Sequence, residues 1–375
     1  MNKKLLFFVT EDWYFCSHRL PLALSAKQAG YDVLVVTRVK EHGGRITGAG
    51  LRLIPLPISR RGINPLTEFA LIIRLISIYR SERPDIVHHI ALKPVLYGSI
   101  ASLATRIPYI VNAMAGLGIL FSSNSLRSRL LRPILKLSFR FFLNRQNTHV
   151  LLQNPDDVQL MCDDVVLDRE RITLIRGSGV DTDQFRSSPE PPGDIIVVLA
   201  SRMLWDKGVG EFVEAARKLK QNGTKARFVL VGKGDKENPC GISDKILQEW
   251  HSEGVIEWWG HRDDMPEVLA CSHIVCLPSY YGEGVPKVLI EAASCARPIV
   301  TTNTPGCREI VRDGINGILI PTRNVEAITV AVSRLIASPE LRVRMGEKGR
   351  EMVESEFSVE KVNAETLRVY KGLVR

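Results

Sequence analysis

At 375 residues, with 45% apolar and 24% charged side chains, the chain has the composition of a globular protein of about two domains, and the lack of an 18-residue apolar run argues against a membrane-spanning helix. Its 7 cysteines are scattered without a matching histidine or cysteine cluster, so we expect reduced thiols rather than a disulfide framework or a zinc site. Residues 1–185 hold 24 Lys and Arg against 15 Asp and Glu, and thus the whole net charge of +9, which predicts an anionic partner for that half.

The N-terminal half alternates strand-like and helix-like segments. Leu5–Thr10 is an apolar run that Glu11 and Asp12 end, so it predicts a buried strand rather than a signal peptide. The later segments that predict strands are 31–37, 51–56, 85–89, 109–112, 148–152 and 172–175. Helices are predicted at 20–29 and 66–79. This alternation predicts a parallel sheet covered by helices.

Four polar side chains of this half follow predicted strands, which is where open parallel sheets bind ligands. His18 and Arg19 open the helix that comes after the first strand. Lys93 follows the strand at 85–89, and Asn112 ends the next strand. We therefore predict that these side chains point toward a ligand cleft. For His18, an ordinary core or surface histidine is the alternative.

Residues 126–143 predict a basic amphipathic helix. Its basic side chains recur every three to four residues: Arg129, Arg132, Lys136 and Arg140. The whole stretch 86–155 contains no acidic residue. We expect residues 126–145 to bind an anionic membrane surface. The alternative is an ordinary domain helix with a solvated basic edge, and Pro133 would kink the helix or mark its start.

A proline-rich segment separates the two halves. Residues 187–193 contain three prolines and a glycine, which predicts an interdomain linker. Strands are predicted beyond it at 194–200, 227–231, 255–259, 274–277 and 299–301, and helices at 325–337, 340–353 and 359–373. We thus predict an α/β protein of two doubly wound Rossmann-like domains, 1–186 and 194–357, that face a cleft.

Cations and glycines follow the strands of the second half. Arg202 and Lys207 come after the first of these strands, and two cations there suit a diphosphate, because Arg makes forked contacts and Lys adds a point charge. Gly232 lies at a strand end, which is a weak signal by itself. His261 and Arg262 follow the strand at 255–259. For Arg202 and Lys207, a solvated loop is the alternative.

The most informative stretch is 279–294, between a buried strand and a helix. Pro286 lies at or near the first helical position, and Gly284 lets the backbone approach a ligand beside free N–H groups that favour an anion. Glu291 lies two turns beyond Gly284, on an apolar helix where a carboxylate needs hydrogen-bond donors. Because the cations and the helix dipole answer the charge of a phosphate, we expect that no metal ion is required.

Two motifs resemble those of a known family. The sequence Ser-Tyr-Tyr-Gly-Glu-Gly-Val-Pro-Lys-Val-Leu-Ile-Glu-Ala-Ala at 279–293 resembles the Glu-x7-Glu motif of the family 4 retaining glycosyltransferases, which have the GT-B fold. Arg-x4-Lys-Gly at 202–208 resembles the phosphate clamp of that family. The resemblance also implies that the last helix, about 358–375, packs back on the N-terminal domain.

The resemblance implies roles for the residues of these motifs. Glu283 would face the transferred sugar and act in catalysis with Arg202 and Lys207, and Glu291 would bind the ribose hydroxyls. The implied donor-binding residues are Arg202, Lys207, Gly232, His261, Arg262, Glu283, Gly284, Val285, Pro286, Lys287 and Glu291. Their ligand would be a nucleoside diphosphate sugar.

The acceptor side departs from the common family pattern. Ala113–Ala115 stand where many members carry a histidine that positions the sugar, and Trp13–Phe15 replace paired glycines, so the acceptor-side catalytic residue stays unassigned. These features, with Ser-His-Arg at 17–19, Lys-Pro at 93–94 and Gly-Leu-Gly at 116–118, resemble a branch that builds bacterial surface glycans. The implied acceptor-binding residues are His18, Arg19, Lys93 and Asn112.

The implied reaction moves a hexose or N-acetylhexosamine from a nucleoside diphosphate sugar, with UDP the commoner choice in this branch, to a lipid-linked glycan. It would retain configuration and serve lipopolysaccharide O-antigen, capsule or exopolysaccharide synthesis. We expect no cofactor and no nucleic acid partner, and a peripheral position on the inner, cytoplasmic face of the bacterial plasma membrane.

Two alternatives remain. One is a UDP-sugar epimerase of GT-B fold, against which the combination of Arg202, Lys207 and the Glu283–Glu291 motif speaks. The other is a nucleic-acid-binding protein that uses the basic half, for which the sequence offers no recognition motif.

Overall fold

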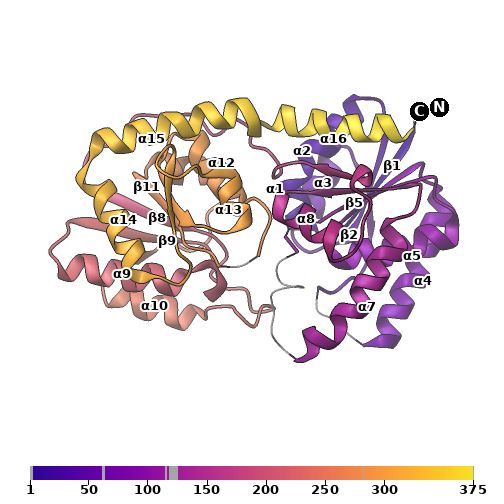
Figure 1. Ribbon diagram of the computed structural model, residues 1–375, viewed down its shortest axis with the longest axis horizontal. Helices are drawn as coiled ribbons and strands as arrows, with labels where there is room; N and C mark the ends of the chain where they lie inside the picture. The colour runs from indigo at the N-terminus through magenta and orange to yellow at the C-terminus, as the bar shows by residue number, and fades with distance from the viewer. Residues whose placement is uncertain (1–2, 61–63, 115, 118–125, 281, 375) are drawn as a thin grey trace. The chain divides into compact units, whose positions relative to one another are not determined.

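A computed structural model describes residues 3–60, 64–114, 116–117, 126–280 and 282–374 (Figure 1). The chain forms two compact units: unit 1 is Met1–Ser178 with Val359–Arg375, and unit 2 is Gly179–Ser358. Among the described residues, no helix is both long and apolar enough to cross a membrane.

The described residues of unit 1 form a seven-stranded parallel sheet in the order β3-β2-β1-β4-β5-β6-β7. Its strands are β1 (Lys4–Glu11), β2 (Asp32–Arg38), β3 (Arg52–Pro55), β4 (Ile86–Ile90), β5 (Tyr109–Ala113), β6 (Thr148–Leu152) and β7 (Ile172–Leu174). β1 is a nearly continuous apolar run because both of its faces are covered. Leu5 and Phe7 belong to the core on one face of the sheet, and Leu6 and Phe8 to the core on the other.

Helices cover both faces of this sheet. They are α1 (Asp12–His18), α2 (Leu20–Gln28), α3 (Gly43–Gly48), α4 (Pro65–Glu82), α5 (Leu92–Thr105), α7 (Leu126–Leu143), α8 (Pro155–Asp163) and α16 (Val359–Leu373). α16 comes from the far end of the chain and packs against α2, where Asn363 Nδ2 donates to Ser25 Oγ at 2.9 Å. Its Tyr370 is buried against β4, with the hydroxyl 2.6 Å from His88 Nδ1. α16 is therefore part of unit 1.

The described residues of unit 2 form a six-stranded parallel sheet in the order β10-β9-β8-β11-β12-β13. Its strands are β8 (Ile195–Ala200), β9 (Ala226–Val231), β10 (Glu257–Trp258), β11 (Ile274–Leu277), β12 (Ile299–Thr302) and β13 (Gly317–Ile320). Its helices are α9 (Val209–Gln221), α10 (Asp244–Ser252), α11 (Met265–Ala270), α12 (Lys287–Ser294), α13 (Pro305–Ile310), α14 (Val325–Ala337) and α15 (Pro339–Met352). Each unit thus confirms the predicted α/β class with a parallel sheet.

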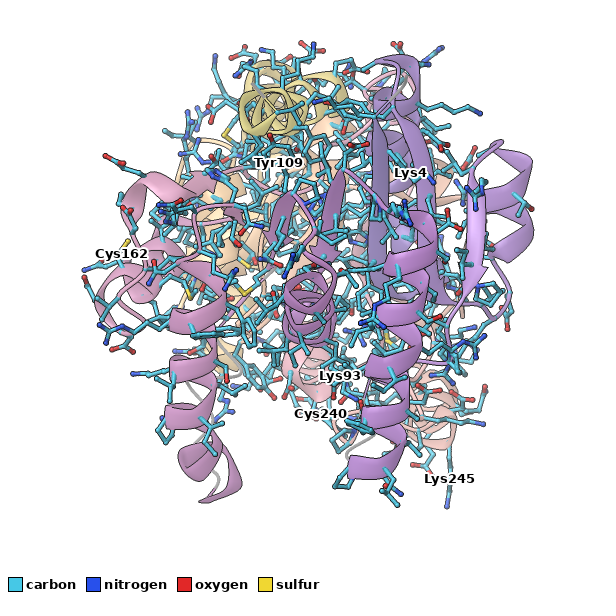
Figure 2. The ribbon with its side chains drawn as sticks, turned by 90° about the vertical axis from the view of Figure 1, so that its right-hand side faces the viewer. Lys4, Lys93, Tyr109, Cys162, Cys240 and Lys245 are labelled. Carbon is cyan, nitrogen blue, oxygen red and sulfur yellow. The ribbon has the colours of Figure 1, made fainter. Side chains whose placement is uncertain are left out.

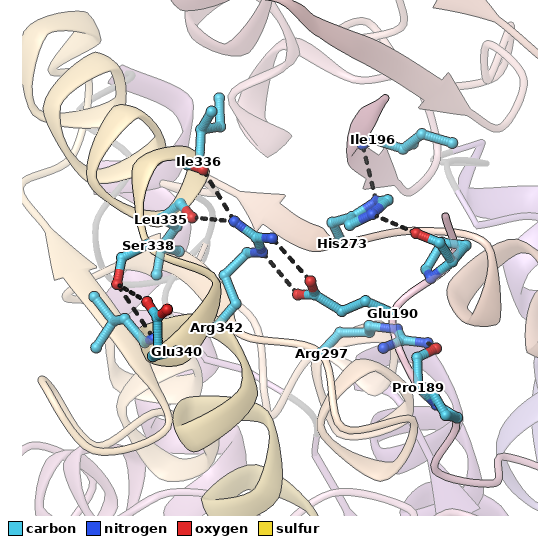
Figure 3. A network of polar contacts seen from close by, with 12 residues as sticks. Pro189, Glu190, Ile196, His273, Arg297, Leu335, Ile336, Ser338, Glu340 and Arg342 are labelled. Atoms are coloured by element: carbon cyan, nitrogen blue, oxygen red, sulfur yellow. Dashed lines mark hydrogen bonds and ion pairs between the residues drawn. The ribbon is translucent and has the colours of Figure 1, made fainter. Parts of the chain in front are cut away.

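The segment 187–193, which we predicted as the linker, is attached to unit 2, and the units divide instead between Ser178 and Gly179. Figure 3 shows the contacts that hold this segment. Glu190 accepts two hydrogen bonds from Arg342 of α15, at 2.7 and 2.8 Å. The buried Arg297 donates to Ser188 Oγ and to the carbonyl of Pro189. These contacts hold the segment on the surface of unit 2, and its proline-rich composition alone does not predict them.

Candidate active site

The stretch 279–294 follows β11 and ends in α12, as predicted, and Pro286 lies directly before the first residue of the helix. The backbone N–H groups of Leu289 and Ile290 both bond to the carbonyl of Pro286. A Cβ on Gly306, which lies in α13, would overlap the carbonyl oxygen of Gly284, so the close approach of the two backbones requires glycine at 306. Sequence reasoning missed Gly306 because it lies 22 residues further along the chain.

Glu283 is fixed by two side chains. Lys207 forms an ion pair with Glu283 Oε2, and Ser279 Oγ donates to Glu283 Oε1 at 3.0 Å. Lys207 is buried, and a buried ammonium requires such a charged partner. The structure therefore brings together one carboxylate and one cation of the predicted catalytic residues.

The loops after β8 and β11 are held together by their backbones. The carbonyl of Asp206 accepts from the N–H of Tyr280 at 3.0 Å and from Ser279 Oγ at 3.3 Å. Gly208 follows with a φ of 74°, and a Cβ there would overlap the carbonyl oxygen of Pro278. Glycine at 208 thus allows Lys207 to reach Glu283.

Glu291 has the partner that a buried carboxylate needs. It lies on α12, one turn beyond Lys287, whose Nζ is 2.7 Å from Glu291 Oε1. The same Nζ lies 5.9 Å from the ring centre of Phe185. Each glutamate of the motif is therefore paired with a lysine in this structure.

Arg202 has a different partner from Lys207. Its Nη1 lies 2.8 Å from Asp235 Oδ2, in the loop after β9. Sequence reasoning missed Asp235, because the pairing depends on the neighbouring positions of β8 and β9 in the sheet. The two cations of the predicted phosphate clamp are thus each neutralised by a carboxylate.

Gly232 connects three of the loops that follow strands. It has a φ of 139°, and a Cβ there would overlap the carbonyl oxygen of Ser201, after β8. Its N–H donates to the carbonyl of Gly260 at 2.6 Å, and its own carbonyl accepts from Trp258 Nε1 at 2.8 Å. The weak signal at Gly232 therefore marks a backbone junction.

His261 and Arg262 are exposed and make only local pairs in the contacts described. His261 Nε2 lies 3.3 Å from Asp263 Oδ1, and Arg262 Nε donates to Asp264 Oδ1 at 2.6 Å. Both are accessible to a ligand. Among the described residues, no group of three or more His, Cys, Asp or Glu side chains is arranged to hold a metal ion.

On the acceptor side, the four predicted residues have different surroundings. Asn112 is fully buried, and its Oδ1 lies 2.8 Å from Nδ1 of His89, whose pKa burial lowers to about 4. Lys93 Nζ bonds to Glu68 at 2.9 Å and to the carbonyl of Ser59 at 2.8 Å. These two predicted residues therefore have structural partners within unit 1.

His18 and Arg19 lie where α1 gives way to α2. The His18 ring stacks on Tyr14 with ring centres 4.3 Å apart, and its Nδ1 is 2.6 Å from Ser17 Oγ. Arg19 is buried and lines a small cavity with Gln153 at the carboxyl end of the sheet, and its Nε has no hydrogen-bond partner within the described part of the chain. Of the four predicted residues, Arg19 is the one that lines this cavity. The stretch that lacks the usual histidine, 112–118, is only partly described, since 115 and 118 lie outside the described residues.

Two family models match the chain. The model described as Glycosyl transferases group 1 matches residues 180–352, and the model described as Glycosyl transferase 4-like matches residues 4–148. The first range contains the Glu283 and Lys207 loops, and the second contains most of the sheet of unit 1.

Relatives with known names match over most of their length. The chain is 28% identical over 338 residues to the N,N'-diacetylbacillosaminyl-diphospho-undecaprenol alpha-1,3-N-acetylgalactosaminyltransferase of Campylobacter jejuni, covering 87% of this chain and 88% of that one. It is 23% identical over 325 residues to the UDP-Gal:alpha-D-GlcNAc-diphosphoundecaprenol alpha-1,3-galactosyltransferase of Escherichia coli, covering 83% and 81%.

Solved structures share the fold at lower identity. Anabaena Alr3699/HepE in complex with UDP and glucose superposes with a TM-score of 0.80 at 17% identity, over 99% of this chain and 100% of that one. The glycosyltransferase of Rickettsia africae gives a TM-score of 0.78 at 18% identity, over 100% and 99%. At these identities the likeness establishes the fold.

Proposed function

Because this chain belongs to the GT-B glycosyltransferases of family 4, we propose that it moves a hexose or N-acetylhexosamine from a UDP-sugar to a lipid-linked glycan, with retention of configuration. The observation that carries the proposal is the pairing of buried Lys207 with Glu283 immediately before α12. A carboxylate for the sugar and a cation for the phosphate are held together beside the N-terminus of α12, where the helix dipole favours an anion.

On binding, the donor would replace the present ion-pair partners of the cations in this site. A diphosphate would take over Lys207 and Arg202 from Glu283 and Asp235, and the ribose hydroxyls would donate to Glu291 beside Lys287. Glu283, released from Lys207, would then accept hydrogen bonds from the sugar hydroxyls. His261 and Arg262 are exposed on the loop that would hold the base.

In the reaction, the bond between the anomeric carbon and the oxygen of the β-phosphate breaks, and the acceptor oxygen bonds to that carbon. The acceptor hydroxyl passes its proton to the departing oxygen of the β-phosphate, and the charge that builds on the diphosphate is stabilised by Lys207, Arg202 and the N-terminus of α12. These fixed charges support a donor site that requires no metal ion.

The nature of the acceptor is supported by the relatives. The names of the two relatives described above specify acceptors linked to undecaprenol through a diphosphate, and a capsular polysaccharide glycosyltransferase of Staphylococcus aureus matches 100% of this chain at 20% identity. We therefore propose a role in lipopolysaccharide O-antigen, capsule or exopolysaccharide synthesis. On the acceptor side, Arg19 is the best placed of the predicted residues, because its buried guanidinium lines a cavity.

A lipid-linked acceptor requires the enzyme to work at a membrane. The proposed contact is the helix α7 with residues up to 145, on the inner face of the plasma membrane. Among its described side chains, Arg132 is partly buried and Arg140 is exposed. Lys136 forms an ion pair with Asp164, with Nζ 3.1 Å from Oδ2. The side chains of 126–131 lie outside the described residues.

The test is a transfer assay. The purified chain is incubated with single UDP-sugars and with polyprenyl-diphosphate-linked mono- and oligosaccharides, and products are weighed by mass spectrometry. The proposal expects a mass gain of one hexose or N-acetylhexosamine on the lipid-linked acceptor, with UDP released. Interconversion of UDP-sugars without acceptor would instead favour an epimerase.

A further inference from the structure

Two helices of unit 1 leave apolar stripes exposed. On α4, Leu66, Phe69 and Ile73 are 79%, 65% and 50% exposed. On α7, Ile134, Leu137 and Phe141 are 61%, 70% and 57% exposed. Both sets follow the spacing i, i+3, i+7, which places the members of each set on one side of their helix. Exposed apolar patches of this kind are unusual on a protein surface that binds no partner, and they often mark an interaction surface.

The two stripes belong to neighbouring helices. α5 packs against both α4 and α7. Figure 2 shows α4 and α7 on either side of α5, with the first turns of both helices at the same end of unit 1, and Figure 1 shows the same arrangement. Leu66 and Phe69 lie in the first two turns of α4, so they lie toward that shared end.

The positive charges around the stripes favour an anionic partner. The exposed positions of α4 carry Arg74 and Arg80. Its two acidic residues are engaged elsewhere, Glu68 with Lys93 at 2.9 Å and Glu82 with Arg52 at 2.8 Å. α7 lies within the stretch 86–155, which contains no acidic residue. Apolar side chains flanked by exposed arginines, here Arg74, Arg80 and Arg140, match the chemistry of an interfacial helix on anionic lipid.

We propose that the α4 and α7 stripes are two parts of one surface that docks on an anionic lipid bilayer, with Leu66, Phe69 and Ile73 entering the headgroup region. This rests on the proposed function, since a lipid-linked acceptor brings the enzyme to a bilayer, and it adds α4 to the contact expected from α7 alone. Two helices held by α5 fix the orientation of unit 1 on the membrane, because a single helix leaves rotation about its own axis free. The orientation would limit which sugars of a lipid-linked acceptor reach the carboxyl end of the sheet of unit 1.

The experiment compares flotation of the full chain with vesicles of phosphatidylcholine alone and with added phosphatidylglycerol. The test variant carries Leu66→Ser, Phe69→Ser and Ile73→Ser. The matched control carries Val330→Ser and Val343→Ser, which remove exposed apolar side chains from α14 and α15 of unit 2. We expect the partition coefficient of the α4 variant onto the anionic vesicles to fall at least about tenfold, because the variant lacks the apolar side chains that would be buried in the membrane. The control variant should bind as the wild type does.

Two outcomes would overturn the proposal. One is unchanged flotation of the α4 variant. The other is a wild type that sediments as a dimer and an α4 variant that sediments as a monomer with equal vesicle binding, which would make the stripe an interface between copies. Circular dichroism and the midpoint of thermal unfolding establish that the variant is folded, and the exposed positions of its substitutions favour this.

The proposed function is tested separately in the same samples. Transfer to a short-chain, water-soluble prenyl diphosphate glycan in detergent does not require a bilayer. The α4 variant is expected to retain this transfer but to lose transfer to a long-chain acceptor in vesicles. If no sugar is transferred in detergent while flotation still depends on α4, then the catalytic proposal fails and the docking proposal stands.

Discussion

At the scale of single residues, the candidate active site holds its charges in pairs. Lys207 with Glu283 and Lys287 with Glu291 each join a cation to a carboxylate that is wholly or partly buried. An incoming donor would offer phosphate to the lysines and hydroxyl groups to the glutamates. Within each pair the two charges balance, and a bound donor would offer a partner to each charged group.

Glu291→Gln is expected to weaken UDP binding. The substitution keeps the shape of the side chain but replaces a charged acceptor with a neutral amide, and hydrogen bonds to a charged group contribute about 1.5–3 kcal/mol. We expect the Kd for UDP to rise roughly tenfold or more, measured by titration calorimetry. Glu326→Gln, on the exposed face of α14, is the control. Equal affinity in the wild type and Glu291→Gln would show that Glu291 does not bind the donor.

The buried histidines of β4 predict a loss of stability in mild acid. Burial lowers the pKa of His89 to about 4 and that of His88 well below its usual range. Above pH 6.5, a histidine that is neutral in both the folded and the unfolded chain does not change the free energy of unfolding. Below pH 6.5, the unfolded chain binds a proton that the folded chain does not bind, so the free energy of unfolding falls. For His89 alone, the free energy of unfolding should fall by about 3 kcal/mol as the pH drops from 6.5 to 4.

Urea unfolding at several pH values measures this effect. His89→Asn should flatten the slope even if it lowers stability at every pH, and an unaltered slope in that variant would contradict the assignment to His89.

At the scale of elements, the active site depends on loops brought together by glycine. Gly208 and Gly223 both have positive φ, at 74° and 80°, but only at Gly208 would a Cβ overlap another backbone, that of Pro278. Gly208→Ala must therefore separate the Lys207 loop from the end of β11. We expect Gly208→Ala to lower both UDP affinity and kcat for transfer, whereas Gly223→Ala should only cost about 1 kcal/mol of stability. Equal UDP affinity and turnover in both variants would mean that this junction does not position Lys207.

The helix α16 stabilises unit 1 from the far end of the chain. Tyr370 is fully buried, and its hydroxyl lies 2.6 Å from Nδ1 of His88. Tyr370→Phe should lower the free energy of unfolding of unit 1 by about 1 kcal/mol, because one buried hydrogen bond is lost and the ring still packs. Urea denaturation measures it, with the fluorescence of Trp13 in unit 1 as a reporter. A change in the free energy of unfolding of less than about 0.3 kcal/mol would mean that this hydrogen bond does not contribute to the stability of unit 1.

The elements that sequence patterns predict are those with strong apolar runs. Strands β1, β2, β8 and β11 are buried on both faces, and each contains a continuous run of at least four apolar residues that predicts a strand. β13 was not predicted, because Gly317–Ile320 is a four-residue strand of which the two central residues are only partly buried. α1 was not predicted either. Its start has no capping side-chain hydrogen bond, and it spans only Asp12–His18.

At the scale of the whole molecule, the sequence predicts the fold class better than the contacts within it. The Glu283–Glu291 motif and Arg202 with Lys207 are local patterns, and the pairing of Lys207 with Glu283 follows from neighbouring strands. The partners of Lys93 and Asn112, in contrast, lie on other elements of unit 1, which a single sequence does not place. The boundary between the units escaped prediction for the same reason, since Glu190 and Ser188 find their partners about 110 to 150 residues further along the chain.

Calorimetric titration of the full chain with UDP and GDP, first without added metal and then with EDTA, tests directly whether the chain has a donor site that requires no metal ion. A ligand that binds a site built from Lys207, Arg202 and the start of α12 needs no metal ion to neutralise its phosphates. We expect UDP to bind equally well with and without EDTA. Loss of UDP binding in EDTA, or no binding of either nucleotide, would contradict this expectation.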